Sequence, residues 1–206
     1  REAARLWMTD TEEALLIYGD ISYWDTSSVT DMTGVFYDDH NRWYQNVFMR
    51  FNASLCGWDV SAVKRMTSLF RGADSFNQPL NHWDVRQVQD MSYMFANATT
   101  FNQSLDCWDV RNVMDMSHMF WEAYRFNQPL DTWNVGKVTN MSSMFVHATR
   151  FNQPLTHWEV SNVKDMSNMF WEATTFNQLL NTWNTCNVTD MNHMFSHATN
   201  FNQPLD

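Results

Sequence analysis

The sequence predicts an α/β repeat solenoid that begins with a helical cap. A 25-residue template recurs without a break, and its tryptophan falls at Trp58, Trp83, Trp108, Trp133, Trp158 and Trp183. Within each copy, apolar residues first alternate as in a strand and then follow the spacing of one helical face. A fixed period of this length is typical of repeat proteins, in which each unit buries its apolar face by stacking on its neighbours.

Residues 1–23 precede the repeats and predict an N-terminal helical cap. Thr9, followed by Glu12 three residues later, has the form of a capping box, and Gly19 stands where a helix over 14–18 would stop. The cap covers the first coil, since an open end of a solenoid needs a lid. Residues 24–206 then form about seven repeats, and we expect their C-terminal end to be uncapped.

One repeat predicts a strand followed by a helix. Trp83 and Val85 flank Asp84, an alternation that suits a short strand with the aspartate turned outward. A stripe of about two helical turns follows at Met91, Met94, Phe95 and Ala98. Stacked in parallel, such units form a leucine-rich-repeat-like coil, with short parallel strands on one face and short helices on the other.

Two polar columns accompany the apolar template. Aspartates stand where the helices are expected to begin and are interpreted as caps, at Asp31, Asp90, Asp115, Asp165 and Asp190. Asparagines recur two residues before the template proline, and we expect them to stack as an inward-facing ladder, at Asn77, Asn102, Asn127, Asn152, Asn177 and Asn202.

The repeat resembles a known family. The pattern V-x-D-M-x-x-M-F-x-x-A-x-x-F-N-Q, in 88–103 and again in 163–178, is similar to the BspA-like leucine-rich-repeat superfamily, in the 25-residue branch of mycoplasma lipoproteins and protist surface proteins. The opening segment, with Leu6, Trp7 and the run 18–32, resembles the non-repetitive cap of such arrays. The resemblance implies a surface or secreted binding scaffold and supplies no catalytic residues.

Charge and hydropathy exclude several classes of function. The chain carries 23 acidic and 13 basic residues, a net charge of -10, which disfavours nucleic-acid binding. Apolar residues come at intervals, so no segment is expected to span a membrane. Cys56, Cys107 and Cys186 fall at different template positions, and no internal disulfide is expected.

The first repeat carries an insertion at 37–50. This stretch contains Trp43, Tyr44 and Phe48, together with His40 beside two aspartates. Insertions in repeat proteins become loops that often bind partners. The aromatic residues either recognise a partner or complete the N-terminal lid, and His40 with its acidic neighbours is a weak metal-site pattern.

An acidic column follows the tryptophans at Asp25, Asp59, Asp84 and Asp109, and continues as Asn134, Glu159 and Asn184. Stacked carboxylates at ~4.8 Å either repel, accept hydrogen bonds from the following turn, or share a cation such as calcium. The turn interpretation is favoured, so no cofactor is expected, with calcium as the alternative.

The position after Met-Phe varies among repeats, which indicates exposure. Trp121, Val146 and Trp171 occupy it in three successive repeats. An exposed apolar strip is typical of an interface, and the alternative is that each tryptophan packs on a neighbouring repeat. Sequons permit glycosylation at Asn97, Asn140 and Asn187 in a secretory setting.

These features predict a non-enzymatic scaffold for protein–protein interaction, at a surface or as a peripheral subunit of a larger assembly. The expected partner is a protein, and the expected location is secreted, cell-surface or in an organellar assembly. A glycan or surface adhesion module is the alternative. A carboxylate-dependent hydrolase is a remote one, because acids at every rung are a repeat property, whereas catalysis needs two carboxyls in unlike environments.

Overall fold

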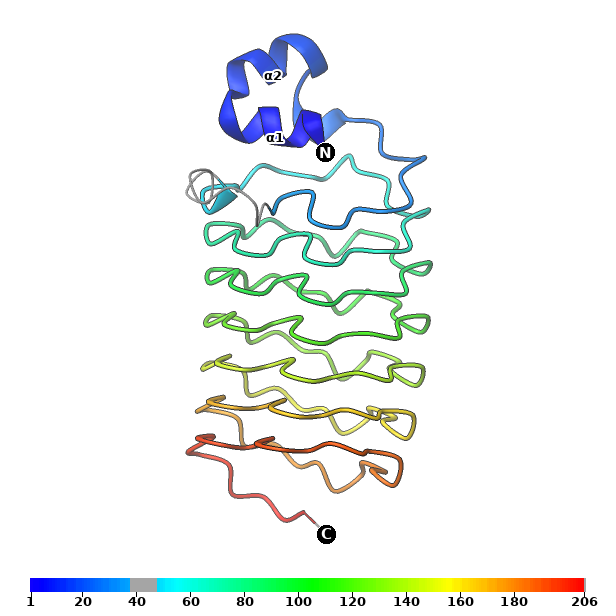
Figure 1. Ribbon diagram of the computed structural model, residues 1–206, viewed down its shortest axis with the longest axis vertical. Coiled ribbons are helices and arrows are strands. Elements are labelled where there is room, and N and C mark those ends of the chain that lie inside the picture. Colours follow the sequence, from blue (N-terminus) through cyan, green and yellow to red (C-terminus); the bar gives the residue numbers. More distant parts are fainter. Residues whose placement is uncertain (38–47, 206) are drawn as a thin grey trace.

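The structure, a computed structural model, describes residues 1–37 and 48–205. A helical cap stands at one end of a stack of coils, and the chain winds through the coils in sequence order towards the opposite end (Figure 1). The cap contains helix α1 (Glu2–Thr9), helix α2 (Thr11–Tyr18) and the 3-10 turn η1 (Ile21–Tyr23). Neither α-helix is long enough to cross a bilayer, and no helix among the described residues is both long and apolar enough to do so.

The cap forms from local signals that the sequence contains, with one change. Helix α2 begins after Asp10, whose side chain accepts a hydrogen bond from the Glu13 N–H at 3.0 Å, and it ends at Gly19 with φ 72°. The predicted stop at Gly19 is therefore confirmed. The predicted capping box at Thr9 is wrong, because Thr9 ends α1 and its hydroxyl donates to the Arg5 carbonyl at 2.9 Å.

The helices expected at 91–98 and its equivalents are absent from the described residues. Tyr93 and Asn97 have φ values of 57° and 58°, in the left-handed region, and two such residues within five positions interrupt a right-handed helix. Backbone N–H groups instead bond both within and between coils. Tyr93 N–H donates to the Ser117 carbonyl of the next coil at 2.9 Å, and Ala96 N–H donates to the Tyr93 carbonyl at 3.1 Å. The helix prediction is wrong because inter-coil bonds satisfy the backbone.

The expected strand is displaced as well. Single parallel bridges join successive coils at the aspartate column, not at Trp83–Val85, and they run through Asp31, Arg65, Asp90, Asp115, Asn140, Asp165 and Asp190. The Asp90 carboxylate accepts from the Ser92 N–H at 2.9 Å, so it caps a turn and not a helix. Each coil is thus built of turns and one bridge, and the leucine-rich-repeat-like class remains a prediction.

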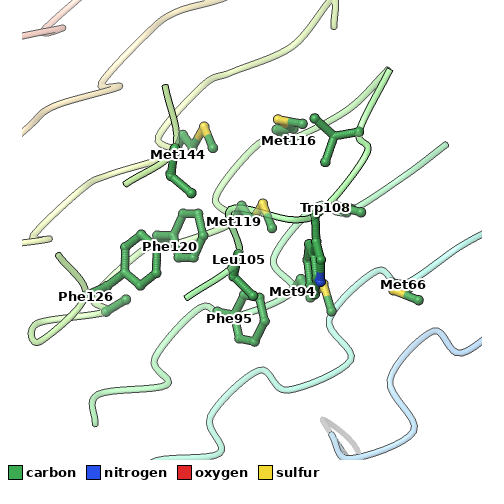
Figure 2. Close-up of a cluster of buried hydrophobic side chains, with 14 of the residues drawn as sticks. Met66, Met94, Phe95, Leu105, Trp108, Met116, Met119, Phe120, Phe126 and Met144 are labelled. Atoms are coloured by element: carbon green, nitrogen blue, oxygen red, sulfur yellow. The ribbon is translucent and has the colours of Figure 1, made fainter. Parts of the chain in front are cut away.

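The apolar template positions fill one continuous core. Phe145 lies between Phe120 and Phe170 of the adjacent coils, with ring centroids 5.7 and 5.5 Å apart, and packs on Phe151 of its own coil at 4.1 Å. Figure 2 shows the neighbouring part of this core, where phenylalanine, leucine and methionine side chains surround Trp108. From Trp58 to Leu180 the repeated Trp, Val, Met, Phe and Ala positions are buried, as the sequence predicts.

Two hydrogen-bonded columns tie the coils together. The Trp108 indole N–H donates to the Leu80 carbonyl of the preceding coil at 2.9 Å, and other coils repeat this bond. The Asn102 amide oxygen accepts from the Asn127 N–H at 2.9 Å and from the Gln128 amide at 3.2 Å. The predicted asparagine ladder is confirmed, although its members are half-buried or exposed at the surface of the coils and do not face the core.

Candidate functional site

One edge of the stack presents side chains from left-handed backbone positions. We call it the left-handed edge, and define it by the second positive-φ residue of each coil: Gly72, Asn97, Glu122, His147, Glu172 and His197. These residues are half-buried, or exposed at His197, and glycine adopts the left-handed conformation without the steric cost that other residues meet. Side-chain chemistry therefore varies along this edge while the backbone stays constant.

A groove of about 440 Å³ lies at this edge beside Gly72. Gly72 stands where the next coils carry Asn97 and Glu122, and a Cβ atom placed on it would meet nothing within 4 Å. The hollow exists because one coil lacks the side chain that its neighbours have. Phe48 and Met49, at the C-terminal end of the insertion, also line the groove.

Arg71 forms one wall of the groove and is held by aromatic rings. Its guanidinium carbon lies 4.8 Å from the centroid of the Tyr37 ring and 4.9 Å from that of Tyr93. The faces of both rings attract the cation, so the side chain is held in place before any ligand arrives. Tyr93 in turn stacks on His118 at 4.2 Å.

Acidic and polar groups line the same groove. Burial raises the pKa of Asp74 above its usual range, against a weak hydrogen bond from the Thr99 hydroxyl at 3.4 Å. Glu122 accepts a hydrogen bond from the Tyr124 hydroxyl at 3.1 Å. Asn97 adds an amide to the lining. Two carboxylates, an amide and a hydroxyl thus converge where a ligand with hydrogen-bond donors or a positive charge would be accepted.

Comparison with known proteins identifies the repeat. The family model described as "Mycoplasma protein of unknown function, DUF285" matches residues 8–120 and 103–206. The chain belongs to this family. The match covers the cap helix α2 and the coils, including the groove. No curated protein and no solved structure matches the chain.

The tryptophan strip predicted for the DUF285 repeats does not form one exposed surface. Trp171 is 37% exposed, Trp121 is half-buried, and Val146 is buried at 5%. Val146 interrupts the strip, so the prediction of a continuous exposed apolar row is wrong.

The acidic column is used by the coils themselves. The Asp59 carboxylate accepts from the Ser61 N–H at 2.9 Å, and Asp25 accepts from both the N–H and the hydroxyl of Ser27. These hydrogen bonds lower the pKa of both carboxyls. Among the described residues, no group of three or more His, Cys, Asp or Glu side chains is suited to hold a metal ion.

Asp84 and Asp109 belong to the same column and pair with arginines. Asp84 lies 2.6 Å from the Arg86 guanidinium, and Asp109 lies 2.8 Å from that of Arg111. The hydrogen bond from the arginine lowers the pKa of each carboxyl. The turn interpretation of this column is therefore confirmed, and a calcium site remains a prediction.

The remaining predicted residues fall at different places. Trp43 and Tyr44 lie outside the described residues. Phe48 is 5% exposed and lines the groove, so its role as a partner contact or as part of the lid stays a prediction. Asn187 is exposed, whereas Asn140 is half-buried and its amide oxygen accepts from the Ser142 N–H at 3.0 Å. Glycosylation at these two sites, and at Asn97 in the groove, stays a prediction.

The groove was not predicted from the sequence, although Gly72, one of two glycines at left-handed positions of the coils, lines it. Gly34 stands at the template position of Tyr93, and Gly72 stands at that of Asn97. Both have positive φ, at 60° and 71°. Glycine at two positions that other repeats fill with larger residues indicates left-handed backbone, and this signal contradicts a helix.

Proposed function

We propose that the chain is a non-enzymatic binding module that recognises a basic segment of a partner protein in the groove beside Gly72. The observation that carries the proposal is the convergence of Asp74 and Glu122 on a hollow of about 440 Å³. A lysine or arginine side chain of the partner would place its cation between the carboxylates and its methylene stem against Met49.

The charge of the whole molecule supports the same class of partner. A net charge of -10 attracts a basic protein over distances longer than any contact and repels an acidic one. The resemblance to BspA-like surface proteins and membership of the DUF285 family are compatible with a role at a cell surface or in a larger assembly, which we include in the proposal.

A binding role accounts for the acidic groups better than catalysis does. Among the described residues, the shortest acid–histidine contact joins Asp131 to His157 at 2.6 Å, and His147 lies 3.2 Å from Glu172. Asp131 also accepts from the His157 N–H at 2.9 Å and from the Thr156 hydroxyl at 3.2 Å. The carboxylate oxygens of Asp131 therefore stabilise a turn. The Thr156 hydroxyl donates a hydrogen bond to this carboxylate and is not activated by it as a nucleophile.

The test fills the groove without changing the backbone. Gly72→Asn introduces the residue that the next coil carries at the same left-handed position, so we expect the variant to fold. The matched control is His147→Asn, which introduces the same residue at the same left-handed position of a coil that does not line the groove. Immobilised wild-type protein and the control should capture the same basic partner from cells that contain this chain, and Gly72→Asn should lose it. Retention of the partner by Gly72→Asn would overturn the proposal.

A glycan is the second candidate ligand, because Asn97 and Thr99 add an amide and a hydroxyl to the two carboxylates. Such groups accept hydrogen bonds from sugar hydroxyls and donate hydrogen bonds to them. A glycan array probed with the same three proteins separates the two ligands. Binding of a neutral glycan that Gly72→Asn abolishes would replace the protein partner by a sugar.

A further inference from the structure

We infer that helix α2 of the cap is a docking surface for an amphipathic helix of a partner protein, one whose apolar face is bordered by lysine or arginine. This surface is separate from the proposed groove beside Gly72. Along the long axis of the molecule, α1 lies between α2 and the coils (Figure 1). Helix α2 is therefore remote from the core of the stack, and Ala14 is the one buried residue among its eight described residues.

The apolar residues of α2 are exposed, although their pattern is that of a covered helix. Leu15, Leu16, Ile17 and Tyr18 are consecutive, and these residues are 43%, 88%, 57% and 46% exposed. Four successive residues point around most of a helix that turns every 3.6 residues. A helix that is apolar on so many sides is normally buried between neighbours. Tyr23 of η1, at 83%, adds a fifth exposed apolar residue to the cap.

The charged groups around these apolar residues have one sign. Residues 6–24 contain no lysine, arginine or histidine, and their four acidic residues are all exposed: Asp10, Glu12, Glu13 and Asp20. The arginines of the cap, Arg1 and Arg5, line a cavity of about 510 Å³ between the cap and the first coils. A partner that covers the apolar residues of α2 therefore meets carboxylates at the border, and lysine or arginine complements them.

The same charge disfavours a second copy of the chain and a bilayer as occupants. Two copies that met through α2 would bring two sets of acidic residues to one interface, in molecules that each have a net charge of -10. Helices that lie on a membrane surface carry lysine and arginine on the polar face, and α2 carries neither. A basic amphipathic helix offers apolar contact and the opposite charge together.

Fluorescence anisotropy of labelled peptides tests this inference on the whole chain. The probe is a helical peptide of about 18 residues with leucine on one face and lysine on the other. The variant is Leu16→Gln with Ile17→Gln. The matched control is Met114→Gln with Leu179→Gln, two apolar residues of the coils that are 48% and 44% exposed. We expect the wild type and the control to bind the peptide equally and the variant to bind it about tenfold more weakly or worse.

A second variant, Glu12→Gln with Glu13→Gln, tests the charge. It should weaken binding of the leucine–lysine peptide and reduce the dependence of this binding on salt. All substituted side chains are exposed, so the unfolding midpoints of these variants should equal that of the wild type. Gly72→Asn should bind the peptide as the wild type does, so failure of this inference is distinguishable from failure of the proposed groove.

Four results would overturn the inference. They are no binding of the leucine–lysine peptide to the wild type, equal weakening in the variant and the control, equal affinity for a peptide with glutamate in place of lysine, and loss of binding in Gly72→Asn. Sedimentation and vesicle binding test the other occupants. Dimerisation of the wild type, or its binding to phosphatidylcholine vesicles, would assign the surface to a second copy or to a bilayer if Leu16→Gln with Ile17→Gln abolished it.

Discussion

The regular coils from Trp83 to Phe176 and the first coils beside the cap share one template, yet they differ in what their side chains contact. In the regular coils, Phe145 is sandwiched between rings and Asn127 bonds to the next coil, so the template groups are committed to the stack. In the first coils the pattern is broken by Gly34, Gly72 and the insertion, and cavities of about 440 and 510 Å³ lie there. A hollow of about 630 Å³ also lies on the regular coils beside Trp133 and His157. Departures from the template thus add cavities to a stack that has one within its regular part.

The cap shows the same contrast at its surface. On the cap, Leu16 is 88% exposed, Ile17 is 57% exposed and Tyr23 is 83% exposed, whereas Phe145 at the centre is fully buried. An apolar residue stabilises the fold only when it leaves water. The regular coils therefore contribute most of the stability, whereas the cap has exposed apolar residues and the first coils have cavities.

The largest expected effect separates these two regions by stability. Phe145→Ala removes a ring that packs against three phenylalanine rings and Trp158, and it should lower the free energy of unfolding by ~3–5 kcal/mol. Leu16→Ser on the cap should change it by less than about 0.5 kcal/mol. Urea unfolding followed by tryptophan fluorescence measures both. Equal losses would contradict the division between the two regions.

The asparagine ladder should show a smaller difference of the same kind. Asn127→Ala leaves the Asn152 N–H without its acceptor, while the Gln153 amide keeps the Asn127 backbone carbonyl at 3.2 Å, and should cost about 1–3 kcal/mol. Asn127→Asp keeps the acceptor oxygen and is the control. Asn52→Ala, at the exposed start of the ladder, should cost less because water reaches the freed groups. A larger loss at Asn52 in urea unfolding would reverse the comparison.

Acid stability should depend on an ion pair of the first coils. Burial alone would raise the pKa of Asp31, but hydrogen bonds from Thr33 and Arg65 lower it from 3.8 to about 2. The carboxylate therefore stabilises the fold above pH 4, and this contribution is lost as the pH falls from about 4 to about 2. Because Asp31 is partly exposed, we expect about 1 kcal/mol.

Asp31→Asn tests this dependence, since Asn140 stands at the same template position in a later coil. The variant should flatten the difference in unfolding free energy between pH 5 and pH 2. Asp59→Asn, at an exposed turn, should leave the profile nearly unchanged. A profile that keeps its full slope in Asp31→Asn would assign the acid sensitivity to other groups.

The smallest expected effect concerns calcium. Asp59, Asp84 and Asp109 bond to the Ser61 N–H and to two arginines, so their oxygens already have partners. Differential scanning calorimetry should show the same Tm in calcium and in chelator, for the wild type and for the triple Asn variant. A Tm that rises with calcium in the wild type alone would establish the cation column.

The candidate site could be predicted only in part. The varied position that contains Trp121 and Trp171 does lie along the left-handed edge, and the insertion does border the groove through Phe48. Neither observation locates the hollow at Gly72. Its walls come from residues of four coils, and the sequence does not state which of their side chains remain uncovered.

The sequence by itself determined the period, the buried residues and the asparagine ladder. A template repeated every 25 residues places equivalent side chains on top of one another, and burial and pairing follow from that stacking alone.

The tertiary structure decided the backbone path and the site. The spacing of Met91, Met94, Phe95 and Ala98 fits a helix, but it fits successive turns equally well. In the coil, N–H groups donate to carbonyls of the next coil, as the Phe95 N–H does to the Met119 carbonyl at 2.9 Å. A helix within one repeat would use the same N–H donors. The choice between helical bonds and inter-coil bonds therefore depends on the neighbouring coil, which a single repeat does not contain.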